Sequence, residues 1–115
     1  MEIHVDRSVL GKEVHVVIDR PLGSTHPKHT HIVYEVNYGY VPDSIGGDGE
    51  EQDAYVLGVN EPITEFDGVV VAIIHRQDDN EDKWVVAPHG YQVSDEEIAA
   101  KTKFQEKYFI TAIIR

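Results

Sequence analysis

The order of apolar and polar residues along the chain predicts a series of short strands followed by one helix. Apolar and β-branched residues gather in short runs that turn-forming residues separate, which is typical of strands. The predicted strands span residues 14–19, 31–36, 53–59, 69–75 and 83–87, with 110–114 as a candidate closing strand. Turns are expected at residues 20–24, 37–40, 62 and 67–68 because Gly, Pro, Asn and Asp occur there.

A helix is predicted after the last of these turns. Ser94 and Glu97 have the spacing of a capping box, in which the serine caps the first turn. Ala100, Phe104 and Tyr108 recur at every fourth position, so we expect them to form the packing face. Five or six short strands and one late helix predict a small, mainly β barrel with a C-terminal helix.

Composition narrows the possible functions. The 115 residues fit a single domain, 1–115, in which 41% of the residues are hydrophobic, enough for a core. The absence of cysteine excludes disulfides and thiolate chemistry. The formal net charge of −11 argues against nucleic acid and against a membrane surface as partners. No signal peptide or membrane-spanning run is recognised, so a cytoplasmic location is expected.

Acidic residues concentrate in two segments of the chain. Residues 43–53 contain five acids and no base, and residues 78–82 contain four acids. Clustered carboxylates repel each other unless cations neutralise them, and Mg²⁺ is the cation that prefers oxygen ligands. The alternative is that both segments are solvated acidic loops. The first segment runs into a predicted strand and the second ends at Lys83, which favours a site for a cation and a phosphate.

Four segments, taken in order, resemble motifs of the family I soluble inorganic pyrophosphatases. Tyr-Glu-Val-Asn-Tyr-Gly-Tyr-Val-Pro at residues 34–42 is similar to that family's Tyr-Pro-x-Asn-Tyr-Gly segment. Asp-Gly-Glu-Glu-Gln-Asp at residues 48–53 is similar to its Asp-Gly-Asp-Pro-Leu-Asp motif. An Asp, a short acidic loop and Glu-Asp-Lys at residues 81–83 follow in the expected order. The resemblance covers roughly residues 14–88.

The resemblance implies a five-stranded OB-like barrel that binds Mg²⁺, with Mn²⁺ as a substitute, and hydrolyses pyrophosphate to two phosphates. It also implies a homo-oligomer, which an apolar C-terminal segment and Trp84 in an apolar strand favour. By position, the metal ligands are Asp19, Asp48, Asp53, Asp79 and Asp82. Glu50 stands where the family has the Asp that deprotonates the attacking water. Lys83 and Tyr38 are the expected phosphate contacts, and Arg76 and Lys28 are further cationic candidates.

The sequence also departs from that family. The segment from Lys28 to Tyr34 is too short for the usual strand with a phosphate-binding Arg, and the late Tyr-Lys pair is reversed as Lys107-Tyr108. Whether Glu81 or Asp82 is the later ligand stays open. Alternative functions are a non-catalytic module that binds metal or phosphate, and a hydrolase of another small diphosphate.

Histidines offer a separate possibility. His26, His29 and His31 have a spacing that a transition-metal site could use, but a polar loop is the simpler interpretation. His75 is expected to be packed or hydrogen-bonded. Tyr34 and Tyr40 are expected to pack in the core with their hydroxyls near water.

Overall fold

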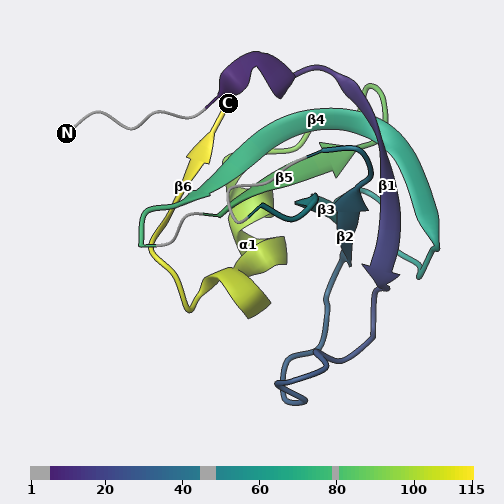
Figure 1. Cartoon of the computed structure of the whole chain (residues 1–115), viewed down its shortest axis with the longest axis vertical. Helices are drawn as coiled ribbons and strands as arrows, with labels where there is room; N and C mark the ends of the chain where they lie inside the picture. The colour runs from purple at the N-terminus through teal and green to yellow at the C-terminus, as the bar shows by residue number, and fades with distance from the viewer. Residues whose placement is uncertain (1–5, 45–48, 79–80) are drawn as a thin grey trace.

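Five strands close into a ring, and a sixth strand and one helix lie outside it (Figure 1). The computed structural model describes residues 6–44, 49–78 and 81–115. The elements in chain order are η1 (Arg7–Val9), β1 (Glu13–Arg20), β2 (Asn37–Val41), β3 (Gln52–Val56), β4 (Glu65–Arg76), β5 (Asp82–Ala87), α1 (Asp95–Glu106) and β6 (Thr111–Ile114). The predicted mainly β barrel with one C-terminal helix is confirmed.

The long strand β4 explains how the barrel closes. The sheet order is β1-β2-β3-β5-β4-β6, and β1 also pairs with β4. The first half of β4 pairs with β1 and its last residues pair with β6, while β5 lies along its other edge. All pairs are antiparallel except β3 with β5. The pairing of β1 with β4 therefore closes the ring, and β6 is not the closing strand that the sequence suggested.

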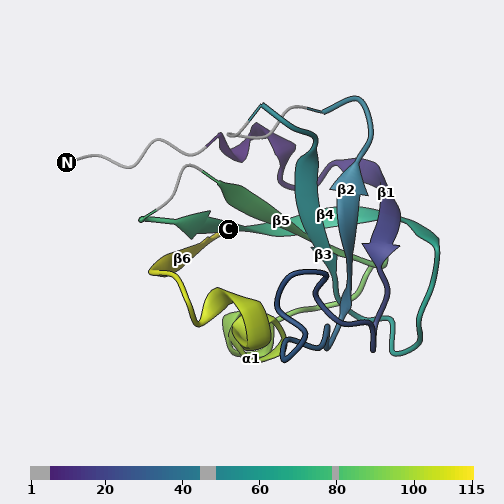
Figure 2. The same ribbon diagram turned by 60° about the horizontal axis from the view of Figure 1, so that its bottom comes forward.

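The strands bury apolar side chains on both faces. One cluster gathers Val16, Val56 and Val86 with other residues of all five ring strands, so it fills the barrel. The second cluster packs Tyr38, Tyr55 and other outward-facing side chains against α1 and the loop between β1 and β2. Alternation along each strand separates the two faces. Figure 2 shows α1 and that loop on the same side of the barrel.

The strand predicted at residues 31–36 is wrong, and β2 instead starts at Asn37, inside the segment that was expected to be a turn. Asn37 is fully buried: its side-chain oxygen accepts from the backbone N–H of Leu22 (2.9 Å) and Ile63 (3.2 Å), and its nitrogen donates to a backbone carbonyl. A Cβ on Gly39 would lie 1.8 Å from the carbonyl oxygen of Val17. These two residues thus serve close strand packing rather than a turn.

Two smaller expectations are also corrected. Asp67 and Gly68, expected as a turn, lie inside β4 and pair with β1. In the helix, Ser94 caps as predicted, accepting from the N–H of Glu97 at 3.1 Å. Its buried residues, however, are Ile98, Thr102, Phe104 and Glu106, whereas Ala100 and Tyr108 are exposed. The packing face therefore contains the predicted Phe104 and, at a spacing of four, Ile98, Thr102 and Glu106.

In the described part of the chain, no helix is long and apolar enough to cross a lipid bilayer.

Candidate active site

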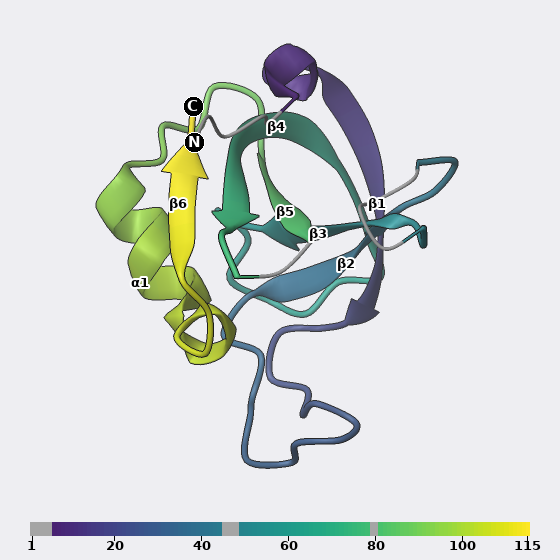
Figure 3. The same ribbon diagram turned by 60° about the vertical axis from the view of Figure 1, so that its left-hand side comes forward.

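A cavity of about 520 Å³ lies beside the C-terminal end of α1, against the sheet face that carries this helix. The loop between β1 and β2 forms another wall, and Figure 3 shows this loop extending past the end of the barrel. Charged side chains from β1, β3, β4 and β5 and from the residue before β5 line the cavity together with tyrosine and histidine rings. Its size is within the range of pockets that hold small-molecule ligands.

A lysine and two carboxylates occupy the centre of the charged lining. The Nζ atom of Lys83 donates to Oδ2 of Asp53 at 2.6 Å and to Oε2 of Glu81 at 2.9 Å. The hydroxyl of Tyr38 donates to the same Asp53 oxygen at 2.9 Å. The Lys83 side chain is 4% exposed and that of Asp53 is 34% exposed, so the carboxylate reaches the cavity.

Strand geometry brings these three groups together. Residues 83, 85 and 87 alternate outward on β5, as do residues 53 and 55 on β3, so Lys83 and Asp53 lie on the face that carries Tyr55 and α1. Burial and the negative charge of Asp53 raise the pKa of Tyr38 well above its ordinary value. Tyr38 therefore stays protonated and acts as a hydrogen-bond donor across the pH range of most enzymes.

Arg76 is held by a buried carboxylate. Its Nε and Nη2 atoms donate to the two oxygens of Glu106 at 2.9 and 2.7 Å, and Nη1 lies 3.3 Å from Oε2 of Glu81. The Phe109 ring covers the guanidinium at 3.7 Å. Burial alone lowers the pKa of Arg76, but the hydrogen bonds and charge of Glu106 outweigh it, so the net pKa is raised. Tyr55 adds a third donor to Glu106 at 2.6 Å.

The structure brings five of the predicted site residues to this cavity: Asp19, Tyr38, Asp53, Arg76 and Lys83. Lys28 is exposed in the loop, and Glu50 is exposed just before β3; neither is among the described residues that line the cavity. Asp48 and Asp79 lie outside the described residues.

Of the two candidates for the later ligand, the structure places Glu81 at the cavity and Asp82 away from it. Glu81 lines the cavity with Lys83, because residues two apart in an extended segment share a face. Asp82 lies on the opposite face, where its Oδ1 atom is 2.7 Å from Nδ1 of His75. This contact also agrees with the expectation that His75 is hydrogen-bonded.

Sequence reasoning missed Glu106 and Gln105. The side-chain oxygen of Gln105 accepts from the Tyr34 hydroxyl at 3.0 Å, and its amide donates to the Tyr55 hydroxyl at 2.7 Å. A signal for Glu106 existed, since it follows Ile98 and Thr102 at a spacing of four on the inner face of the helix. The tyrosines behave partly as expected: Tyr34 is buried in the cluster against α1, while Tyr40 is only partly buried.

The donor set suits a hard cation better than a transition metal. Asp53 and Glu81 contact one ammonium group, so their carboxylates converge, and Asp19 lies in the same cavity. Such oxygen atoms are the ligand type that Mg²⁺ prefers. Among the described residues, no three His, Asp or Glu side chains come together closely enough to hold a metal ion, and this includes His26, His29 and His31.

Desolvation raises the pKa of Asp19, and Arg20 beside it opposes that shift. The nearby charge of Asp53 adds to the rise. Asp19 is therefore near enough to Asp53 to be affected by its negative charge.

A β barrel whose cavity gathers converging carboxylates, a buried lysine and a tyrosine hydroxyl has the groups needed to bind a small charged ligand. Solved structures with this fold are inorganic pyrophosphatases. That of Ehrlichia chaffeensis matches with a TM-score of 0.67 at 17% identity over 89% of this chain and 84% of that one. That of Coxiella burnetii matches with a TM-score of 0.66 at 18% identity over 95% and 88%. That of Neisseria gonorrhoeae matches with a TM-score of 0.66 at 18% identity over 89% and 80%.

The family model described as inorganic pyrophosphatase matches residues 9–109. The chain therefore belongs to the inorganic pyrophosphatase family, which confirms the resemblance and the expected enzyme class, an inorganic diphosphatase. A search of curated protein sequences found no match.

Proposed function

We propose that this chain hydrolyses inorganic pyrophosphate to two phosphates in a Mg²⁺-dependent reaction, with Mn²⁺ as a substitute. The observation that supports it most is the cluster at Lys83, where one ammonium group contacts Asp53 and Glu81 beside the hydroxyl of Tyr38. Pyrophosphate is highly charged, so its hydrolysis depends mainly on positioning and on neutralising charge. The cluster supplies both kinds of group in one cavity.

Each residue has a distinct part in this proposal. Asp53 and Glu81, whose carboxylates converge, would hold Mg²⁺ together with Asp48 and Asp79 from the predicted set, and Asp19 lines the same cavity. When bound, Mg²⁺ lowers the pKa of a coordinated water and neutralises phosphate oxygens. In this proposal Lys83 donates to a phosphate oxygen, and the hydroxyl of the protonated Tyr38, which donates to Asp53 in this structure, is the second phosphate contact.

The remaining predicted residues contribute less directly. Arg76 adds positive charge to the wall, although Glu106 fixes its guanidinium in place. Glu50 remains our candidate for the base that accepts the proton of the attacking water, because the motif puts it two residues after Asp48. Lys28 is a peripheral cation on the loop.

Phosphate release from pyrophosphate, measured with and without Mg²⁺ or Mn²⁺, tests the proposal. The Lys83→Met variant should lower kcat/KM by about 100-fold or more, since a donor aimed at developing charge is removed. Lys12→Met, an exposed lysine before β1, serves as the matched control and should leave kcat/KM unchanged. A nucleoside diphosphate as second substrate distinguishes hydrolysis of another small diphosphate. Binding of Mg²⁺ and phosphate without turnover would instead support a non-catalytic binding module.

We also expect a homo-oligomer in the cytoplasm. The apolar strand that contains Trp84 gives little support to an oligomer, because its residues Val85 and Val86 are already fully buried within one chain. Val33, Tyr108 and Ile110 have exposed apolar side chains, which a subunit interface could bury. Light scattering at micromolar concentration checks this expectation, and a monomer would contradict it.

A further inference from the structure

The loop between β1 and β2, residues 21–36, is held in place by hydrogen bonds along its length, and we call it the arm. The N–H of Gly23 donates to the carbonyl of Tyr34 at 2.8 Å, and the N–H of Tyr34 donates to the carbonyl of Ser24 at 2.8 Å. Further along, the N–H of His26 donates to the carbonyl of Ile32 at 2.9 Å. The arm is tied to α1 through the Tyr34 hydroxyl, which donates to Gln105. Side chains on the arm are thereby held in a defined place on the cavity wall.

His26 is oriented by the backbone of this arm. Its Nδ1 atom faces the N–H groups of Lys28 at 3.1 Å and His29 at 3.2 Å, so Nδ1 acts as an acceptor and carries no proton. The ring proton is therefore on Nε2, which makes that atom a hydrogen-bond donor. The ring lies nearly parallel to that of Tyr34, with an interplanar angle of 8° and centroids 6.3 Å apart. The neutral ring of His26 thus offers the N–H of Nε2 as a donor from a fixed position on the cavity wall.

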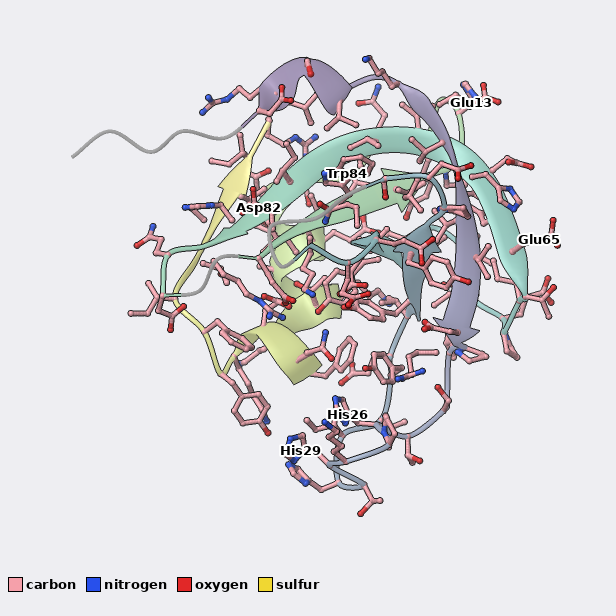
Figure 4. The ribbon with its side chains drawn as sticks, viewed as in Figure 1. Glu13, His26, His29, Glu65, Asp82 and Trp84 are labelled. Carbon is pink, nitrogen blue, oxygen red and sulfur yellow. The ribbon has the colours of Figure 1, made fainter. Side chains whose placement is uncertain are left out.

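His29 extends the same surface. Its ring centroid lies 4.9 Å from that of His26, and both rings line the cavity. Figure 4 shows the two labelled rings together on the loop, below the end of the barrel. Burial, and then the nearby His29, Arg20, Lys28 and His31, lower the pKa of His26. Basic side chains thus gather on this part of the wall, whereas carboxylates line other parts of the cavity.

Arg20 completes this wall at the end of β1. It is the cavity-lining cation with the longest contact to a carboxylate: Nη1 lies 3.6 Å from Oδ2 of Asp19, against 2.6 Å for Lys83 and 2.7 Å for Arg76. Its side chain is 33% exposed, whereas Arg76 is 5% exposed. Nη1 also donates to the backbone carbonyl of Asp19 at 3.1 Å, so among the described cavity cations Arg20 has the weakest contact with a carboxylate and the most exposed side chain.

We propose that Arg20, His26 and His29 form a phosphate subsite on the wall made by the loop, which holds one phosphate group of the substrate. This inference rests on the proposed function and extends it to residues that neither the motifs nor the family match assigns. The chemistry of His26 favours an anion over a metal ion, because a metal needs an unprotonated nitrogen whereas Nε2 of His26 carries the proton. In the resembling family a strand in this region carries a phosphate-binding Arg, and residues 28–34 are too short to form that strand. The subsite would supply cationic and N–H contacts to phosphate in its place.

Binding of methylenediphosphonate, a non-hydrolysable diphosphate, measured by calorimetry in the presence of Mg²⁺, tests the subsite. Arg20→Gln removes the charge, and His29→Gln removes the ring. His26→Asn keeps an acceptor for the backbone N–H groups of Lys28 and His29 but removes the donor that Nε2 supplies. Each should raise the Kd for the diphosphonate, Arg20→Gln by about 10-fold or more, because hydrogen bonds to charged groups are strong. His89→Gln, on the exposed turn after β5, should leave the Kd unchanged.

The outcomes separate the alternatives. Kd values within twofold of the wild type for both Arg20→Gln and the His26→Asn/His29→Gln double variant would overturn the subsite. A variant that loses binding of Mg²⁺ or Zn²⁺ alone but keeps the diphosphonate would show a metal site instead. If the wild type binds the diphosphonate through these residues but releases no phosphate from pyrophosphate, the subsite stands and the proposed function fails. Thermal melting verifies that each variant is folded, and the backbone hydrogen bonds of the loop do not involve the Arg20 side chain.

Discussion

Replacing Glu106 by Gln tests how strongly the buried ion pair behind the cavity stabilises the fold. Arg76 and Glu106 are 5% and 6% exposed and share two hydrogen bonds of 2.9 and 2.7 Å. The Tyr55 hydroxyl donates to the same carboxylate at 2.6 Å. Glutamine has nearly the same shape, but its amide is neutral and one of the two carboxylate oxygens becomes an NH₂ group facing donors. Among the described residues, Glu81 at 3.3 Å would then be the carboxylate that remains beside the buried guanidinium.

The expected loss of stability follows from this geometry. Removing one partner of a buried ion pair destabilises a protein by about 3–5 kcal/mol. Because glutamine keeps one acceptor and Glu81 remains, we expect a decrease of about 2–4 kcal/mol in the free energy of unfolding. For a domain of this size, such a decrease lowers Tm by roughly 8–16 °C.

Urea unfolding without metal or substrate measures the effect, with Glu96→Gln in the exposed first turn of α1 as the matched control. The control should change the free energy of unfolding by less than about 0.5 kcal/mol. The double variant Arg76→Met/Glu106→Leu should be more stable than Glu106→Gln, because it leaves no uncompensated charge. The reasoning fails if Glu106→Gln loses less than about 1 kcal/mol, or if the double variant is as unstable as the single one.

Three further predictions concern the cavity and the strand motif. Mg²⁺ at 100 times its Kd should stabilise the fold by about 2.7 kcal/mol, measured as a rise in Tm, and Asp53→Asn should reduce this rise and the turnover together. Glu50→Gln should lower kcat by about 10²- to 10⁴-fold while the calorimetric Kd for Mg²⁺ stays nearly constant, and full activity would exclude Glu50 as the base. Gly39→Ala should lower the free energy of unfolding by at least about 2 kcal/mol in urea, since its Cβ would meet the Val17 carbonyl, and wild-type stability would contradict that contact.

The hydrophobic pattern predicted most strands because their buried positions recur along short segments. Residues 14–19, 69–75 and 83–87 lie within observed strands, and the capping serine fixed the start of the helix. The strand predicted at residues 53–59 ends earlier, at Val56, and β2 was missed because Asn37 and Gly39 are common turn residues. Their role depends on partners far along the chain, such as Glu61 and Val17, which no local pattern reveals.

The candidate site was predictable where function depends on alternation within one strand. Lys83 was expected on a strand, and extending that strand toward its N-terminus already puts Glu81 on the same face and Asp82 on the other. Glu106 was harder to find, because it lies 30 residues from Arg76 and meets it only after the helix has packed on the sheet. Which residue neutralises a buried charge depends on tertiary packing, so the local sequence gives little indication of it.

The polar groups of the site form one connected network, and this ties stability to activity. Its hydrogen bonds and ion pairs link, in order, Tyr38, Asp53, Lys83, Glu81, Arg76, Glu106 and Tyr55. Among the described residues, every buried side-chain nitrogen or oxygen has a hydrogen-bond partner. A satisfied network in a region of low dielectric constant is rigid, but losing one member leaves its neighbours unpaired and destabilises the fold. Apolar side chains would stabilise so small a barrel at least as well, so the network is better explained by the preorganised charges that binding a diphosphate requires.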